Sequence, residues 1–139
     1  MKPQLAIVGA GLGGLAAALF LRRAGIEATV LEATSELREV GAGIVVPPNM
    51  VRALALLGLD RELPAFAPRL EAAWEFRRWQ DGRVLSSQPM GEACLQLYGA
   101  HCHVAHRGEM LALLRQALPD DAVQLDRRCT GLQQDENGV

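Results

Sequence analysis

Residues 4–32 read QLAIVGAGLGGLAAALFLRRAGIEATVLE. The apolar run Gln4–Val8 ends at a glycine and has the length of a buried parallel strand. Apolar residues then recur at helical spacing from Leu12, until two arginines and Gly25 mark the end of a helix. A second apolar run, Ile26–Leu31, has the character of a second strand. The stretch therefore predicts a strand–helix–strand unit in about thirty residues.

The turn before the predicted helix carries the pattern G-x-G-x-x-G. In this context the first glycine allows a tight turn, the second lets the backbone approach a pyrophosphate, and the third lets helix and strand pack closely. The N–H groups and the dipole at the helix start favour bound phosphates. The alternative is a packing turn without a ligand. The pattern predicts a dinucleotide site on Gly9, Ala10, Gly11, Leu12, Gly13 and Gly14.

An acidic residue, Glu32, stands at the end of the second predicted strand, 18 residues after Gly14. A carboxylate at this point accepts hydrogen bonds from a ribose diol and disfavours a 2′-phosphate. The dinucleotide of this unit is therefore expected to be FAD or NAD rather than NADP. The glycines and Glu32 do not distinguish between those two.

The composition is that of an ordinary globular chain. The 139 residues are 50% apolar and 22% charged, with a net charge of −2. These values exclude a disordered tail, and they offer no excess of basic residues for nucleic acid. Three cysteines are too few for a disulfide scaffold, which favours the cytoplasm. An uncharged run covers residues 3–21, but four glycines in its middle argue against a membrane span or a signal peptide.

The rest of the chain alternates between loops, strands and helices. Residues 33–48 are expected to form a long loop, and Asn49 is expected to cap a helix that Gly58 ends. A polar linker is expected around Pro89 and Gly91. The other expected elements are a hairpin of residues 71–79 and 83–87, strands at 101–105, 123–125 and 129–133, a helix at 107–118 and a hairpin turn at 136–138.

Two further clusters of side chains, one of histidines and a cysteine and one of aromatic residues, are considered as candidate sites. His101, Cys102, His103 and His106 lack the second paired element that a tetrahedral metal site needs, so a strand with polar side chains is the preferred interpretation. Trp74 and Phe76 alternate on one predicted strand, and core packing of a second domain is the simplest role for that face.

Three stretches resemble the single-component FAD-dependent aromatic hydroxylases, the group A flavoprotein monooxygenases, and most closely their salicylate-hydroxylase-like members. The likeness covers the first 131 or so residues. It is carried by the N-terminal unit through Leu31-Glu32-Ala33, by the segment LREVGAGI at 37–44 with Pro48-Asn49 and Leu57–Leu59, and by HRGEM at 106–110, which opens a helix ending in Gln116-Ala117-Leu118.

The resemblance implies a set of FAD contacts. The glycine turn, Glu32 and Ala33 would hold the ADP half, and the loop with Gly43 and Ile44 would run along the ribose and flavin. Arg107 would reach the phosphates and the ribityl chain. The strand around Cys129 would offer backbone groups to the adenine, and Arg38 would face either the cofactor or solvent.

Arg107 also has an argument of its own. A cation in the first turn of a helix opposes the helix dipole, and a bound anion nearby would turn that cost into a gain. The alternative is a solvated surface arginine.

The implied fold is α/β: an incomplete Rossmann-type FAD-binding βαβ unit with a parallel sheet, plus a β-hairpin from the start of a substrate domain. Residues 1–139 would form an incomplete FAD-binding domain, with 66–105 as an excursion into that substrate domain, where Trp74 and Phe76 could line a pocket. Two later motifs of the family, an Asp-Gly segment linked to FAD and NADPH and a Gly-Asp segment linked to the flavin end, are not in the sequence; the pair Asp81-Gly82 belongs to the predicted hairpin. We therefore expect an N-terminal portion whose first strand has an open, apolar edge.

In the complete enzyme, the resemblance implies that NADPH or NADH reduces the flavin and that a small aromatic substrate is hydroxylated with O2. No residue is identified as catalytic, and the oligomeric state stays open. The alternatives are a non-catalytic, truncated nucleotide-binding fragment and the NAD-binding half of a dehydrogenase.

Overall fold

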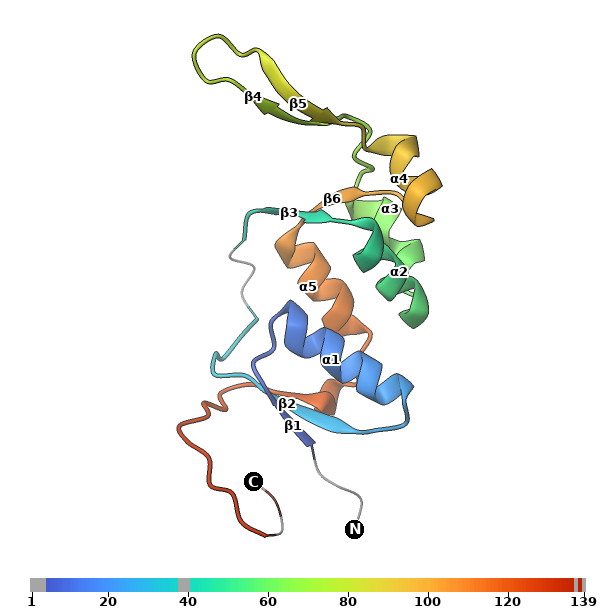
Figure 1. Ribbon diagram of the computed structural model, residues 1–139. Helices are drawn as coiled ribbons and strands as arrows, with labels where there is room; N and C mark the ends of the chain where they lie inside the picture. Colours follow the sequence, from blue (N-terminus) through green and yellow to red (C-terminus); the bar gives the residue numbers. More distant parts are fainter. Residues whose placement is uncertain (1–4, 38–40, 137, 139) are drawn as a thin grey trace. The chain divides into compact units, whose positions relative to one another are not determined.

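The computed structural model describes residues 5–37, 41–136 and 138. The chain divides into two compact units, Met1–Glu39 with Met110–Val139 and Val40–Glu109. Each unit is described by itself (Figure 1).

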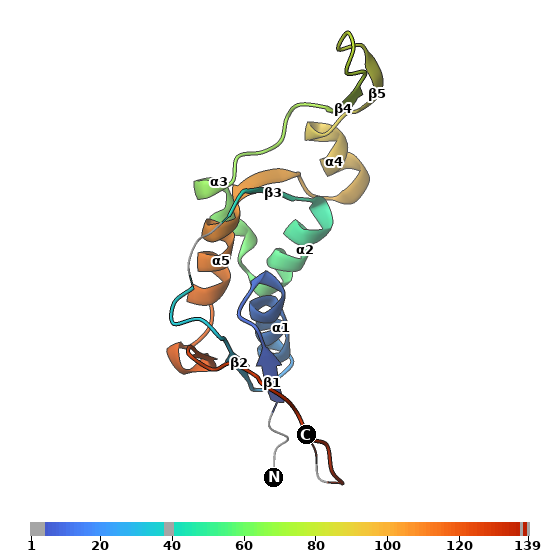
Figure 2. The same ribbon diagram turned by 90° about the vertical axis from the view of Figure 1, so that its left-hand side faces the viewer.

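The first unit is built on a three-stranded parallel sheet with the order β1-β2-β7. Helix α1 packs against β1 and β2, and the views in Figures 1 and 2 show it running along the sheet. The predicted strand–helix–strand unit is thus confirmed. The elements of this unit are β1 (Leu5–Val8), α1 (Leu12–Arg23), β2 (Ala28–Leu31), the C-terminal part of α5 (Arg107–Gln116), the 3-10 turn η2 (Asp120–Ala122) and β7 (Val123–Gln124).

The central strand β2 carries the core of this unit. Val30 is completely buried, and it pairs with Ile7 on one side and with Val123 on the other. Strand β1 forms an edge of the sheet, as expected, with the side chains of Leu5 and Val8 39% and 65% exposed. The other core residues are Ala10, Leu15, Ala18, Leu19, Met110, Leu111, Leu114, Leu118 and Val123.

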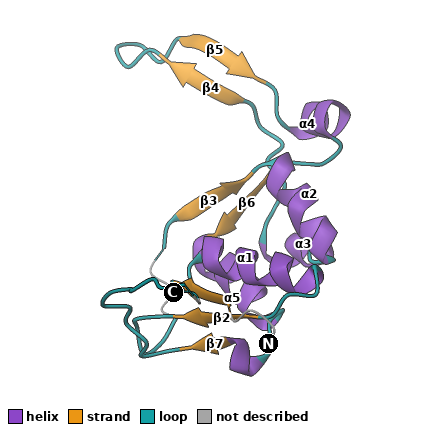
Figure 3. Ribbon diagram, turned by 60° about the horizontal axis from the view of Figure 1, so that its bottom comes forward, coloured by secondary structure: helices purple, strands orange, loops and turns teal. Residues whose placement is uncertain are grey.

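The second unit contains two small antiparallel sheets, β3–β6 and β4–β5 (Figure 3). Helix α2 packs against η1 and α4. The elements are β3 (Gly43–Val46), α2 (Pro48–Leu57), η1 (Asp60–Glu62), α3 (Leu63–Phe66), β4 (Trp74–Arg77), β5 (Val84–Gln88), α4 (Gly91–Tyr98), β6 (His103–His106) and the first residues of α5.

Three expectations for the second unit are wrong. Residues 33–48 are not all loop, because Gly43–Val46 pairs with a strand sixty residues away, which local turn signals do not reveal. Pro47, not Asn49, is the N-cap of α2, so Pro48 takes the first helical position that proline favours. The expected polar linker contains α4, which ends at Gly99 with a φ of 73°.

The predicted hairpin of the second unit is confirmed, but its aromatic side chains are not in a core of the described chain. Trp74 and Phe76 are 45% and 62% exposed on β4.

In the C-terminal segment, residues 129–133 form no strand, contrary to expectation. A turn does follow, where Asp135 N–H donates to the carbonyl of Gly138 at 2.9 Å, while Asn137 lies outside the described residues. Throughout the described ranges, no helix has both the length and the apolar character needed to cross a bilayer.

Two neighbouring glycines of α1 give a test of the packing. A Cβ on Gly14 would overlap the carbonyl oxygen of Gly9, whereas a Cβ on Gly13 would meet no atom within 4 Å. We therefore expect Gly14→Ala to lower the free energy of unfolding by at least about 2 kcal/mol, because backbone would have to move. The matched control Gly13→Ala should raise it by about 0.5–1 kcal/mol, because alanine is the better helix former.

The measurement is urea unfolding of both variants beside the unmodified chain. Equal stability of the two variants would show that the close approach of α1 to the glycine turn is wrong.

Candidate functional site

The glycine turn leaves the start of α1 open. Gly9 has a φ of +99°, and its N–H donates to the carbonyl of Leu31 at 2.8 Å, which fixes the turn to the end of β2. Gly11 is the N-cap of α1 in an extended conformation, and no side chain caps the helix. The first intrahelical bond runs from Leu15 N–H to Gly11, so the N–H groups of the three preceding residues have no acceptor within the helix.

Within the part of the chain that the structure describes, two glycines of this turn also have open space beside them. Ideal Cβ atoms built on Gly11 and Gly13 meet nothing within 4 Å, and Leu12 between them is half-buried. The first turn of α1 contains no acidic residue. The observed geometry is therefore one that a diphosphate fits, with bare N–H groups, the positive end of a helix dipole and no side chain in the way.

Glu32 turns its carboxylate toward the glycine turn. Its Oε2 accepts a hydrogen bond from Ala10 N–H at 2.8 Å, and its Oε1 accepts from the N–H and the hydroxyl of Thr34, both at 3.0 Å. The bond from Ala10 is the main reason that the pKa of Glu32 is lowered, with the Thr34 N–H next, and partial burial opposes both. The carboxylate is thus ionised at neutral pH and held beside the turn, while Ala33 is half-buried next to it.

The chain after β7 runs beside Glu32. Arg127 N–H donates to the Glu32 carbonyl at 2.7 Å, and Asp126 N–H donates to the Thr34 carbonyl at 3.0 Å. Cys129, whose backbone the resemblance expects beside the adenine, is exposed, and its thiol lies 3.6 Å from the Gly131 carbonyl. The backbone next to Glu32 belongs to residues 126–127, and the left-handed φ of 55° at Asp126 is the feature that turns it there.

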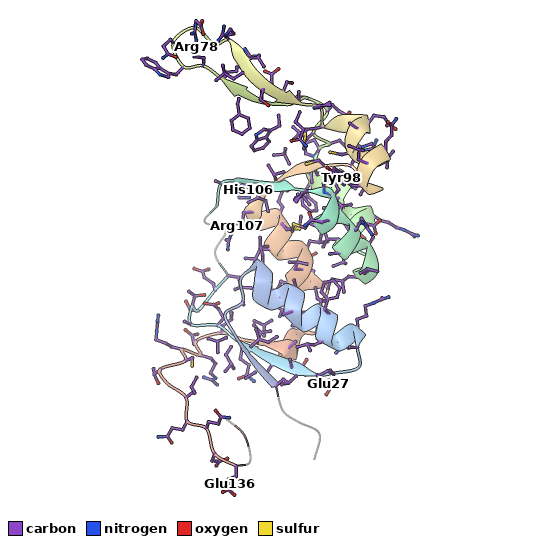
Figure 4. All side chains as sticks on the ribbon, viewed as in Figure 1. Glu27, Arg78, Tyr98, His106, Arg107 and Glu136 are labelled. Atoms are coloured by element: carbon purple, nitrogen blue, oxygen red, sulfur yellow. The ribbon has the colours of Figure 1, made fainter. Side chains whose placement is uncertain are left out.

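A second group of predicted residues meets in the second unit. In the β3–β6 ladder Gly43 lies opposite His106 and Ile44 lies opposite Ala105. Arg107 N–H donates to the Ala42 carbonyl at 3.3 Å. Figure 4 shows His106 and Arg107 at the junction of β6 and α5. Of the remaining predicted residues, Arg38 lies outside the described residues.

Gly41 is glycine because of this junction rather than because of its own backbone angles. An ideal Cβ on it would lie 2.9 Å from Cβ of Arg107 and 3.6 Å from both Cγ and Cδ. The aliphatic stem of Arg107 therefore runs directly over the Gly41 backbone. The sequence places Gly41 within the segment LREVGAGI but gives no indication of this contact, because Arg107 is 66 residues away.

The histidines take separate partners. His103 is buried and its Nδ1 donates to the Ala67 carbonyl at 2.7 Å, whereas His106 is exposed and contacts Gly41. Among residues 5–37, 41–136 and 138, no group of three or more His, Cys, Asp or Glu could hold a metal ion. The thiol of Cys102 is buried, which raises its pKa.

The sequence profile of the family described as FAD binding domain matches residues 2–139. A 3-amino-4-hydroxybenzoate 2-monooxygenase of Streptomyces platensis is 39% identical over 99% of this chain, and a 6-hydroxynicotinate 3-monooxygenase of Bordetella bronchiseptica is 35% identical over 99%. The match covers 35% and 36% of those two proteins, so the chain spans about a third of the length of the curated relatives it matches.

The chain is also similar to a solved structure. A variant of Klebsiella pneumoniae HpxO complexed with FAD superposes with a TM-score of 0.80 and 28% identity. The superposition covers 96% of this chain and 34% of that one.

The lowered pKa of Glu32 predicts a pH-dependent contribution to stability. Because the folded state favours the carboxylate, the stabilisation is full above the ordinary pKa of a glutamate and is lost as pH falls through the folded value. Glu32→Gln presents one acceptor and one donor where two acceptors are needed. We expect it to lower the free energy of unfolding by about 0.5–1.5 kcal/mol at about pH 7, and by less at about pH 4.

Urea unfolding at both pH values measures this difference. Thr34→Val is the matched control, since it removes the hydroxyl that bonds Glu32 but keeps the N–H. Its effect should be the smaller of the two, and a pH-independent difference between Glu32→Gln and the unmodified chain would contradict the assignment.

Proposed function

The chain belongs to the FAD binding domain family, and from that premise we propose that it holds the ADP half of FAD in a flavin-dependent monooxygenase that hydroxylates a small aromatic ring. The observation that carries the proposal is the open N-terminus of α1 beside an ionised Glu32, joined by the 2.8 Å bond from Ala10 N–H to the carboxylate. The helix start takes the diphosphate, and Glu32 takes the ribose hydroxyls.

Each residue of the glycine turn has a distinct part in this binding. The N–H groups of Leu12, Gly13 and Gly14 face the phosphates at the start of α1, and Gly11 leaves room for them because it has no Cβ. Glu32 is already ionised and oriented, so little of its rotational freedom remains to be lost when a ribose binds.

The adenine is expected to lie against the backbone of residues 126–127, which runs beside Glu32 and Thr34. The segment around Cys129, which the resemblance assigns to the adenine, follows directly in the chain and remains part of this proposal.

We also propose cofactor contacts for a group of residues in the second unit. We assign Gly43, Ile44 and Arg107 to this group, because the β3–β6 ladder and the bond from Arg107 N–H to Ala42 bring them together. The guanidinium of Arg107 would pair with a phosphate, and such a charge-assisted hydrogen bond is about twice as strong as a neutral one. The cation then compensates for its unfavourable place at the start of α5.

A flavin bound here would supply the redox chemistry: it would take electrons from NADPH or NADH and use O2, with one oxygen atom going to the ring and the other leaving as water. The substrate class follows from the relatives, whose names specify a hydroxylated benzoate and a hydroxylated nicotinate. A cytoplasmic location accords with three free cysteines, two of them buried.

Gly11→Ala tests binding without disturbing the fold. Its φ of −71° suits alanine and its Cβ would meet no protein atom within 4 Å, so we expect stability to change by less than about 0.5 kcal/mol. The same Cβ would enter the space assigned to the diphosphate. FAD affinity should therefore fall at least about tenfold, which is about 1.4 kcal/mol.

Fluorescence titration of the unmodified chain and of Gly11→Ala with FAD, NADH and NADPH measures both affinity and choice of cofactor. Saturable NADH binding without FAD binding would reject FAD in favour of a dehydrogenase-like unit. Unchanged FAD affinity in Gly11→Ala would place the diphosphate elsewhere.

A further inference from the structure

His106 joins two parts of the second unit that are far apart in sequence. It is the last residue of β6, where it pairs with Gly43. Its ring Nε2 lies 3.1 Å from the carbonyl oxygen of Gly41, 65 residues earlier in the chain. Its Nδ1 lies 3.2 Å from the N–H of Gly108, in the first turn of α5. One imidazole thus connects the segment before β3 to the start of the helix that carries Arg107.

The two hydrogen-bond partners decide which nitrogen of the ring carries the hydrogen. Gly108 offers an N–H, so Nδ1 has to be the acceptor and carries no proton. Gly41 offers a carbonyl oxygen, so Nε2 has to be the donor and carries the proton. Both bonds are satisfied together only by the neutral imidazole with its hydrogen on Nε2, which also adds no second cation beside Arg107 at the start of α5.

The contact with Gly41 leads directly to Arg107. Three stem atoms of Arg107, Cβ, Cγ and Cδ, lie within 2.9–3.6 Å of the place where a Cβ on Gly41 would be. The backbone N–H of Arg107 donates to Ala42, the next residue. The position of the Gly41 backbone therefore sets the surface along which the Arg107 side chain extends, and His106 holds that backbone in place.

We propose that His106 is a positioning residue that orients Arg107 for the cofactor by holding the Gly41 carbonyl through Nε2–H. This rests on the proposed function, in which Arg107 binds a phosphate of FAD. The cap that Nδ1 supplies to Gly108 is a separate, structural contribution to α5. The two ring nitrogens thus have different consequences, which substitution can separate.

Glutamine and asparagine each reproduce one nitrogen of the ring. In His106→Gln the amide nitrogen reaches the place of Nε2 and can donate to Gly41, whereas in His106→Asn the amide oxygen reaches the place of Nδ1 and can accept from Gly108. We expect His106→Gln to keep FAD affinity within about threefold of the unmodified chain, and His106→Asn to lose about tenfold while keeping its resistance to urea. His106→Ala should lose both.

A double-mutant cycle with Arg107→Met tests whether the effect passes through the arginine. Met keeps the apolar stem over Gly41 and removes the cation. In that background we expect His106→Asn to change FAD affinity by less than about twofold, because the group that it misplaces is gone.

The experiment is FAD fluorescence titration of the full 139-residue chain and its variants, each with a urea unfolding curve. Affinity retained in His106→Asn and lost in His106→Gln would overturn the inference, since a cap alone would then explain the data. An undiminished tenfold loss in the Arg107→Met background would overturn it as well. FAD binding that is equal in all variants removes the inference alone, whereas no FAD binding by the unmodified chain removes the proposed function together with it.

Discussion

The close approach of α1 to the carbonyl of Gly9 is the constraint on which the first unit depends. Helix α1 starts so near the end of β1 that position 14 has no room for a side chain. The glycine turn before the helix is fixed to the end of β2 by the bond from Gly9 N–H to Leu31, and the helix start has no side-chain cap among the described residues. Glu32 then reaches Ala10 across 22 residues and closes the arrangement. The packing of α1, the position of its uncapped N-terminus and the place of the Glu32 carboxylate therefore all depend on this backbone contact.

The second unit also contains a glycine that a close contact requires, but the neighbouring group is a side chain rather than a backbone carbonyl. Gly41 has no left-handed backbone angle, yet it too is a glycine required by proximity, here to the stem of Arg107. In both places the absence of a Cβ allows a close contact that a side chain would prevent, with the Gly9 carbonyl in the first unit and with the Arg107 stem in the second. The difference lies in what holds the contact: a strand pair and a carboxylate in the first unit, and the neutral imidazole of His106 in the second.

Features that depend on residues close together in the sequence were predictable, whereas features that depend on contacts between distant residues were not. The unit of β1, α1 and β2 was predictable because period, glycine spacing and the position of Glu32 are all local. Strand β3 was missed because its only strong signal, Ile44-Val45-Val46, is too short to outweigh the glycines and prolines around it, and its partner is β6. The course of residues 126–127 beside Glu32 was not predictable, because it depends on one φ angle at Asp126. The functions of Gly41 and His106 arise from a contact across 65 residues, which no local pattern encodes.

Two of the glycines in the turn are not explained by the stability of the folded chain, and this bears on function. Gly14 is required by packing and Gly9 by its φ, so both are explained within the folded chain. Gly11 and Gly13 are not, because a Cβ on either would meet no protein atom within 4 Å. Gly13 lies inside α1, where a glycine costs about 0.5–1 kcal/mol relative to alanine, whereas Gly11 is the extended N-cap and carries no such helix cost. Proteins commonly retain such a cost where binding needs the space. The open side of Gly13 and Gly11, seen among the described residues, is therefore the physical reason for proposing a ligand there, and the N–H groups at the helix start favour an anion.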